Sequence, residues 1–462
     1  MIVPLRELHI ENFRGVRQAK IRLDPKVTVL FGANAAGKTT LLDALAIGLG
    51  AISARVPRAK GRGFASRGDL RIEGWQRTIL EVLGAEPALH PREPGPEARF
   101  ARISLQSDGC NWDVTKFRSP QDRDSVPRGK GVKSLNEWLD PRIREALDTP
   151  GRPTPAIPLV AAYGNERAVV DVPLREKFFN RDFDRFGGLD GALQATTRFK
   201  TVFEWFRVME DEERRGKESH QDFGYRLPAL QWVRRAVRAA ELRCRNPRVE
   251  TGPIRMLVDF EQDDHLQSLD IRALSDGFRT HFSLVVDLAR RMVQLNPSDD
   301  LDDPERGTNS PAIVLIDEVD LHLDPRWQAR VVRGLCMAFP NTQFVLTTHS
   351  EQVIGSVDAA QVRRLRWHDG EIVAEEVPFA QGATAERILI ELMDASERVP
   401  GAVTEKLERY LALVTNGDGR GPEAVGLREH LAMVLRDDPA LHRADLEMQR
   451  QALMAKVRGT EA

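Results

Sequence analysis

Residues 32–39 read Gly32-Ala33-Asn34-Ala35-Ala36-Gly37-Lys38-Thr39, and Thr40 follows them. An unbroken apolar run, residues 27–31, precedes this stretch, and apolar residues at helical spacing follow it. The pattern predicts a buried strand, a glycine-rich loop and a helix, in that order. In such a loop the backbone N–H groups, the start of the helix and Lys38 bind nucleotide phosphates, and the Thr39 hydroxyl binds Mg²⁺. We therefore expect ATP and Mg²⁺ at residues 32–40.

A second apolar run, residues 313–316, ends in the acidic pair Asp317 and Glu318. Beside the loop strand in one sheet, Asp317 would hold the magnesium ion, and Glu318 would orient and deprotonate a water. By themselves, two acids after an apolar run are also typical of a strand that enters solvent. The phosphate-binding loop upstream favours the catalytic interpretation.

Two further stretches fit the same site. Leu274-Ser275-Asp276-Gly277 stands where a helix is predicted to begin. The Ser275 hydroxyl and the free N–H groups of the helix start could therefore bind an anion. The alternative is an ordinary helix cap by Ser275 or Asp276. His349 follows the apolar run 343–348, and ligand contacts gather at such strand ends in α/β sheets. A lone histidine is usually structural, but this position favours a functional role.

Composition sets the broad class of the protein. A chain of 462 residues predicts one large domain with a substantial insertion, or two domains. With a formal charge of -2, the protein as a whole does not attract nucleic acid or a membrane surface. Contact with DNA would therefore need a local basic face. The three cysteines, Cys110, Cys244 and Cys336, lie far apart in the sequence, which is typical of a protein in a reducing compartment. Their spacing matches no zinc-binding motif. Without a signal peptide or a membrane-length apolar run, we expect a soluble, cytoplasmic protein.

Three stretches resemble the RecF, SMC and OLD-like branch of ATP-binding-cassette ATPases: residues 8–15, 274–279 and 316–328. In that class two copies form a head-to-tail dimer. The resemblance implies that Ser275, Asp276 and Gly277 meet the γ-phosphate on the partner's loop, although Asp276 replaces the commoner glycine. It also implies that His349 contacts the γ-phosphate and the attacking water. The class carries a glutamine loop as well, for which Gln76 is the candidate.

Within this branch, the short insertion and Thr347-Thr348-His349-Ser350 resemble the ATPase subunit of Septu-type antiphage systems, including retron-associated versions. The resemblance implies a homodimer or higher homo-oligomer that holds or gates a separate HNH endonuclease. In a retron version a reverse transcriptase with its RNA/DNA product would join the assembly. We expect no nuclease domain on the chain itself, because residues 350–462 lack the acidic pattern of the Toprim domain in OLD-type nucleases.

The predicted fold is α/β: a P-loop ATPase head of the ABC type, in which helices flank a mixed or parallel sheet beside an antiparallel β subdomain. Residues 1–50 form its first part, with the phosphate-binding loop, and residues 51–135 a β-rich and loop-rich part. A mainly helical insertion, a lid or arm, is expected over residues 136–250. Residues 251–380 complete the head, and residues 381–462 form a helical tail.

Two rival functions stay open from the sequence: a RecF-like repair ATPase that clamps DNA, and a scaffold whose nucleotide is structural. Runs of charged residues usually form only a solvent-exposed surface. A basic cluster predicted on a helix is nevertheless the best candidate for a nucleic-acid contact. Its members are Arg234, Arg235, Arg238, Arg243, Arg245 and Arg248. A transporter subunit is disfavoured, since nothing indicates a membrane partner. Tail leucines at helical spacing predict either a packed core or a nuclease-docking surface; they are Leu407, Leu411, Leu427, Leu431 and Leu435.

Overall fold

The computed structural model divides the chain into two compact units, Met1–Ile388 and Leu389–Ala462. The residues that it describes are 4–73, 95–148, 154–165, 183–194, 199–251, 254–262, 265–396, 398 and 400–459. Each unit is treated by itself below. No helix within these ranges is both long and apolar enough to cross a membrane.

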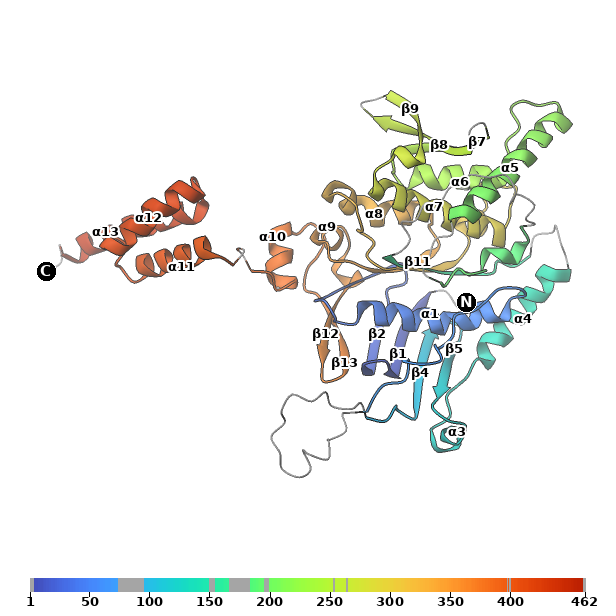
Figure 1. Cartoon of the computed structure of the whole chain (residues 1–462), viewed down its shortest axis with the longest axis horizontal. Helices are drawn as coiled ribbons and strands as arrows, with labels where there is room; N and C mark the ends of the chain where they lie inside the picture. The colour runs from blue at the N-terminus through green and yellow to red at the C-terminus, as the bar shows by residue number, and fades with distance from the viewer. Residues whose placement is uncertain are drawn as a thin grey trace. The chain divides into compact units, whose positions relative to one another are not determined.

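A ten-stranded sheet forms the centre of the first unit (Figure 1), in the order β5-β4-β1-β2-β13-β12-β3-β11-β10-β6. One half is a parallel block in which β3, β11, β10 and β6 are buried at every residue, as in strands covered on both faces. The block consists of β12 (Val362–His368), β3 (Val27–Phe31), β11 (Thr342–Thr347), β10 (Ala312–Ile316) and β6 (Leu159–Tyr163). Because these strands run parallel, their carboxyl ends meet at one edge of the sheet.

The other half of the sheet is largely antiparallel. Its strands are β1 (Leu5–Phe13), β2 (Val16–Arg22), β4 (Phe100–Ser107), β5 (Asn111–Phe117) and β13 (Glu371–Glu376). Strand β13 forms a hairpin with β12 and also pairs with β2, so it joins the two halves. The predicted α/β class, with a mixed sheet and an antiparallel part, is confirmed.

Helices cover the parallel block on both sides (Figure 1). Helix α1 (Lys38–Arg55) packs against β4 and β6, and α4 (Lys133–Asp148) packs against α1. On the other side of β11 lie α5 (Phe199–His220), α6 (Pro228–Ala239), α7 (Asp276–Leu295) and α8 (Pro325–Ala338). A separate antiparallel sheet adjoins them, with β7 (Cys244–Thr251), β8 (Ile254–Gln262) and β9 (His265–Asp270). Two short helices, α3 (Asp122–Ser125) and α9 (Glu351–Ile354), also belong to this unit.

Strand β6 lies inside the range 136–250, where mainly helical structure was expected. Its sequence, Leu159-Val160-Ala161-Ala162-Tyr163, is apolar throughout, and periodicity cannot distinguish such a short run from a buried helix segment. The strand pairs with β10 along its whole length, from Leu159 opposite Ala312 to Tyr163 opposite Ile316. Part of this range therefore belongs to the sheet of the head, while α5 and α6 supply the expected helices.

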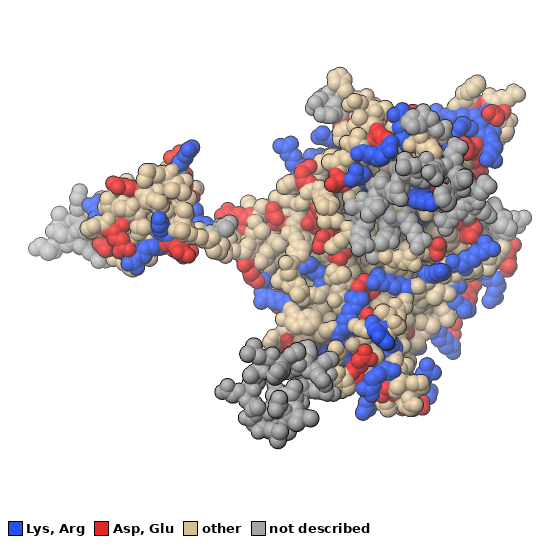
Figure 2. All heavy atoms as spheres, viewed as in Figure 1, with Lys and Arg blue, Asp and Glu red and all other residues tan. Residues whose placement is uncertain are grey.

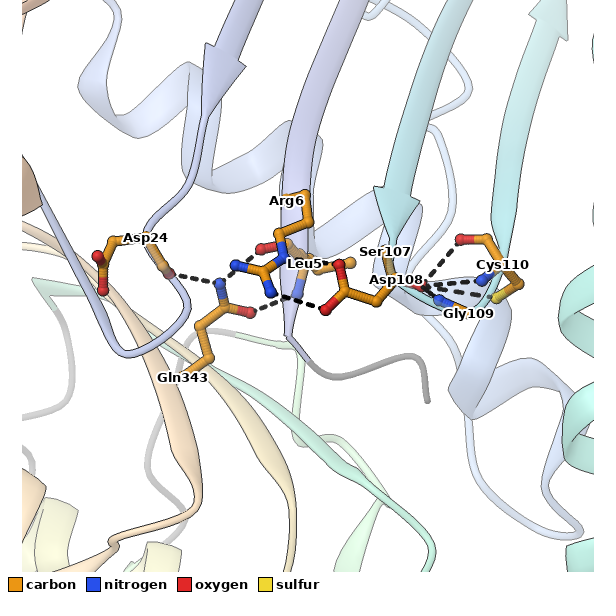
Figure 3. A network of polar contacts seen from close by, with 8 residues as sticks. All are labelled: Leu5, Arg6, Asp24, Ser107, Asp108, Gly109, Cys110 and Gln343. Atoms are coloured by element: carbon orange, nitrogen blue, oxygen red, sulfur yellow. Dashed lines mark hydrogen bonds and ion pairs between the residues drawn. The ribbon is translucent and has the colours of Figure 1, made fainter.

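A buried glutamine joins the parallel block to the start of the antiparallel half (Figure 3). The side chain of Gln343, on β11, accepts a hydrogen bond from the Leu5 N–H and donates to the Leu5 carbonyl, both over 2.8 Å. It also donates to the Asp24 carbonyl over 2.7 Å. Beside it, the Arg6 guanidinium spans from β1 to Asp108 with two hydrogen bonds of 2.7 Å. The Gln343 contacts fix β1 against β11, and the Arg6 contact ties β1 to the turn between β4 and β5.

The second unit is a bundle of α11 (Ala402–Thr415), α12 (Pro422–Leu435) and α13 (Pro439–Gly459) with its own core. Leu407 and Leu431 are fully buried in that core, and the remaining predicted leucines pack partly buried against it: Leu411, Leu427 and Leu435. These leucines therefore hold the three helices together. The short turn α10 (Ala385–Arg387) precedes this unit.

Candidate nucleotide-binding site

The glycine-rich loop connects the buried end of β3 to the start of α1. Gly37 adopts a left-handed conformation, with φ of 92°, directly before the first helical residue. A side-chain carbon there would collide with Ile372 on β13, and one at Gly32 would lie 2.5 Å from the Leu365 carbonyl on β12. Glycine is therefore required at both ends of the loop, because the β12–β13 hairpin packs directly against it.

Lys38 lies folded over its own loop. Its Nζ donates hydrogen bonds to the carbonyls of Gly32, over 2.8 Å, and Ala33, over 3.1 Å. Burial lowers the pKa of Lys38, while the carboxylates of Asp317 and Glu318 act in the opposite direction. The ammonium thus stands over the loop, where a phosphate in the loop would meet it.

Thr39 and Asp317 meet at the other end of the loop. The Thr39 hydroxyl donates to Oδ2 of Asp317 over 3.0 Å, and the hydroxyl of Thr347 donates to Oδ1 over 2.5 Å. Within the described ranges, no group of three or more His, Cys, Asp or Glu side chains could hold a metal ion. A metal at this end would therefore take its other ligands from phosphate and water. Mg²⁺ binds in that way, so these two residues fit it.

Glu318 and His349 follow the carboxyl ends of two neighbouring strands, β10 and β11. Glu318 has a positive φ of 48°, and its N–H donates to the Thr347 hydroxyl over 2.7 Å. His349 is exposed, two residues beyond the end of β11. The sheet thus gathers Lys38, Asp317, Glu318 and His349 at one edge. The strand before Asp317 was expected beside the loop strand, but β11 lies between β3 and β10, because local patterns do not specify the order of strands in a sheet.

Ser275 and Asp276 are exposed at the start of α7. The side chain of Ser275 makes no capping hydrogen bond, and Asp276 forms an ion pair with Arg279. Gly277 is buried against the turn after Glu318, because a side-chain carbon there would collide with the His322 carbonyl. Among the hydrogen bonds of the described residues, none links residues 275–277 to the loop of the same chain. The exposed hydroxyl of Ser275 is therefore not engaged by its own phosphate-binding loop.

A cavity of about 290 Å³ beside Thr39 and Asp317 contains polar residues that the sequence did not single out. Asn165 follows the end of β6 and lines this cavity together with Gln194 and Arg62. The signal that could have found Asn165 is its position just after a buried apolar run, as with Asp317. Gln76, the candidate for the glutamine loop, lies outside the described residues.

A buried ion cluster connects α7 to β6. Asp287 forms ion pairs of 2.8 Å with both Arg290 and Arg291, and it accepts a hydrogen bond from the Tyr163 hydroxyl over 3.0 Å. Burial alone would raise the pKa of Asp287, but the two arginines lower it to about 2. The Tyr163 carbonyl in turn accepts from the N–H of Asp317 over 2.8 Å. The helix that begins at Asp276 is thus fixed to the strand next to Asp317.

The basic cluster after residue 233 is largely neutralised. Helix α6 ends at Ala239, so only its first three arginines lie on a helix. Four arginines form ion pairs: Arg234 with Glu213, Arg235 with Asp302, Arg245 with Glu261 and Arg248 with Asp259. Basic and acidic side chains intermingle over the visible face of the first unit (Figure 2). The described part of this cluster therefore forms no uniformly positive surface.

One family model and several known proteins resemble this chain in sequence. Residues 27–355 match a family model described as "AAA domain, putative AbiEii toxin, Type IV TA system". "Retron Ec83 probable ATPase" from Escherichia coli is 25% identical over 96% of this chain and 86% of that protein. "Retron Vc95 probable ATPase" from Vibrio cholerae is 23% identical over 90% of this chain and 84% of that protein. The Septu protein PtuA from Bacillus mycoides is 32% identical over 31% of this chain and 19% of its own length.

The matched range begins at β3 and extends beyond His349, so it includes the glycine-rich loop and the acidic pair. Such relatives imply nucleotide binding and ATPase activity. The chain therefore belongs to this AAA-domain family, and its relatives include the probable ATPases of two retrons and a Septu protein.

Proposed function

We propose that this antiphage-defence ATPase is a dimeric switch. Two copies close head to tail on two ATP molecules, hydrolyse them slowly, and thereby control a separate nuclease of the HNH type. The proposal rests on one observation above all. The start of α7, with Ser275 and Asp276, is exposed and makes no hydrogen bond to its own phosphate-binding loop.

In this proposal the loop residues 32–40 bind the phosphates, and Lys38 neutralises the β- and γ-phosphates. Thr39 and Asp317 hold Mg²⁺, which supplies positive charge to the oxygens of the transferred phosphate. Glu318 accepts a proton from the attacking water, and His349 contacts the γ-phosphate from the next strand. The 2.5 Å hydrogen bond from Thr347 to Asp317 supports this arrangement, because it fixes the carboxylate toward Thr39.

The second copy supplies Ser275, Asp276 and Gly277. A helix N-terminus with free N–H groups attracts an anion, and the γ-phosphate on the other copy's loop is the anion that the proposal assigns to it. Gly277 packs against His322, so this helix start and the turn after Glu318 present one continuous surface. A closed dimer would thus place catalytic and sensing residues of both copies at each ATP.

Complementation between two inactive variants tests the composite site. Lys38→Ala removes phosphate binding, and Ser275→Arg blocks the surface offered to the partner, so each variant alone should hydrolyse no ATP. Mixed together they should regain activity, because a mixed dimer keeps one site with an intact Lys38 and an intact Ser275. A mixture of Lys38→Ala and Glu318→Gln is the control, since both changes lie on the same side of each site and no intact site forms. Absence of recovery in the first mixture contradicts the composite site.

The nuclease partner is tested by co-expression with any HNH protein that a neighbouring gene encodes. The second unit, with its own core, supports a separate attachment surface, and several of its apolar side chains are exposed: Met433, Leu446 and Leu453. The nuclease should co-purify with the ATPase, and its activity should differ between wild type and Glu318→Gln. Equal nuclease activity in both would contradict control by the nucleotide. A reverse transcriptase that co-purifies would add the retron form.

A RecF-like ATPase that clamps DNA receives less support. Ion pairs occupy four arginines of the cluster that was the best DNA candidate, as described above. Binding to duplex DNA that weakens steeply with salt, and is lost on neutralising Arg234, Arg235 and Arg238 together, would favour that function instead.

A further inference from the structure

The β12–β13 hairpin stands on the side of the phosphate-binding loop opposite to the metal end. In the sheet, β11 and β10 lie on one side of β3, and β12 and β13 lie on the other. Asp317, which meets Thr39, follows β10. Thr39 and Asp317 would hold Mg²⁺ beside the terminal phosphates, so a triphosphate bound in this loop would extend its ribose and base away from β10. The base would therefore lie toward the hairpin.

Trp367, on β12, is the aromatic side chain at that place. A side-chain carbon built on Gly15, in the turn between β1 and β2, would lie 3.1 Å from Cη2 of its indole ring. One built on Gly37 would lie 4.0 Å from Cε3. The ring thus reaches from the β1–β2 turn to the residue directly before Lys38. Glycine at both positions leaves the ring close to the backbone.

Trp367 is nevertheless 43% exposed, whereas Trp112 and Trp205 are at most 2% exposed. Packing against two glycines does not account for a large apolar ring in solvent, since folding normally buries such side chains. Its opposite neighbour on β13, Ile372, lies against Gly37 and already covers the loop. The indole is therefore available as a flat apolar surface at the edge of the loop.

We propose that Trp367 stacks on the base of the nucleotide, an inference that rests on nucleotide binding by the loop. Stacking of a base on an aromatic ring tolerates any base, because every base has a π face. The ring then contributes to nucleotide affinity and does not distinguish ATP from GTP. The ring makes no contact with the triphosphate, so the affinity for a ligand without a base does not depend on Trp367.

Titration calorimetry with ATP, GTP and inorganic tripolyphosphate, each with Mg²⁺, tests this inference. For Trp367→Ala we expect ATP and GTP to bind about tenfold more weakly, with tripolyphosphate affinity unchanged. Trp367→Phe should retain most of the affinity for both nucleotides. Val373→Ala is the matched control. Val373 is also 43% exposed on the hairpin but follows Ile372, so it points to the opposite face, and all three affinities should stay unchanged.

Two results would overturn the inference. Equal weakening of ATP and tripolyphosphate in Trp367→Ala would mean that the ring only supports the loop. Unchanged ATP affinity in that variant would mean that the base does not contact it. Failure of nucleotide binding itself gives a different result, in which the wild type binds none of the three ligands. Lys38→Ala should lose all three, which marks the loop as their common site.

Discussion

Thr347 donates a hydrogen bond from its hydroxyl to Oδ1 of Asp317 over 2.5 Å, and the same hydroxyl accepts from the N–H of Glu318 over 2.7 Å. One side chain of β11 thus fixes both acidic residues at the end of β10. His349 follows on the same chain segment two residues later. The chain segment that carries this histidine therefore also holds the Asp317 carboxylate and the Glu318 backbone.

Thr347→Val should weaken Mg²⁺-dependent hydrolysis by about tenfold to a hundredfold, because partners that orient a metal ligand carry effects of that size. ATP affinity measured in the presence of a chelator should stay unchanged, since the hydroxyl of Thr347 bonds to Asp317 and the Glu318 N–H and makes no hydrogen bond to residues 32–40 among the described residues. Thr347→Ser, which keeps the hydroxyl, is the control and should retain activity. A Thr347→Ser variant as impaired as Thr347→Val would show that the methyl group, not the hydroxyl, matters.

Glu318→Gln should bind ATP but hydrolyse it at least about a hundredfold more slowly, because an amide cannot accept the proton of the attacking water. The closed dimer should accumulate with ATP, which size-exclusion chromatography coupled to light scattering would measure. Turnover at the wild-type rate would rule out Glu318 as the base.

Asp287→Asn should destabilise the first unit by roughly 3–5 kcal/mol, because it leaves two buried arginines without their carboxylate. Tyr163→Phe removes a single hydrogen bond to the same carboxylate and should cost about 1 kcal/mol. Denaturant unfolding of both variants measures the difference. Asp302→Asn is the control, since Asp302 pairs with Arg235 on the surface at 89% side-chain exposure and should change stability little. Equal losses for Asp287→Asn and Asp302→Asn would contradict the importance of the buried cluster.

The stability of the protein should fall as pH rises from about 4.5 to about 7 through one residue of α5. Burial raises the pKa of Glu210 from 4.5 to about 7, partly offset by its hydrogen bond from the Val249 N–H. Between pH 4.5 and about pH 7, Glu210 holds a proton in the folded state that it has released in the unfolded state. The stabilisation from this proton is therefore complete below pH 4.5 and lost above about pH 7.

Glu210→Gln should abolish this dependence, so that the wild type loses roughly 3 kcal/mol relative to the variant between pH 4.5 and pH 8. Thermal unfolding at a series of pH values measures it. Glu212→Gln, at an exposed position of the same helix, should follow the wild type. Parallel pH profiles for wild type and Glu210→Gln would contradict the raised pKa.

The parts of the site that follow a strand were predictable from sequence, because buried runs before Gly32, Asp317 and His349 indicate parallel strands whose ends meet. Asn165 was missed although it follows an apolar run, because periodicity does not distinguish so short a run from a buried helix segment. The Thr347 contact was also hidden, because sequence places a threonine near a strand end but not its rotamer. Contacts between distant segments, such as Trp367 against Gly15 and Gly37, depend on strand order, which local patterns do not specify.

The hairpin against Gly32 and Gly37 also has a consequence for synthesis of the protein. The loop strand β3 leaves the ribosome early, yet both of its neighbours in the sheet, β11 and β12, come more than 300 residues later. A nascent chain therefore carries the glycine-rich segment long before the surfaces that shape it exist. We therefore expect nucleotide binding only after β11 and β12 have been synthesised, because both strands flank the strand that leads into the loop.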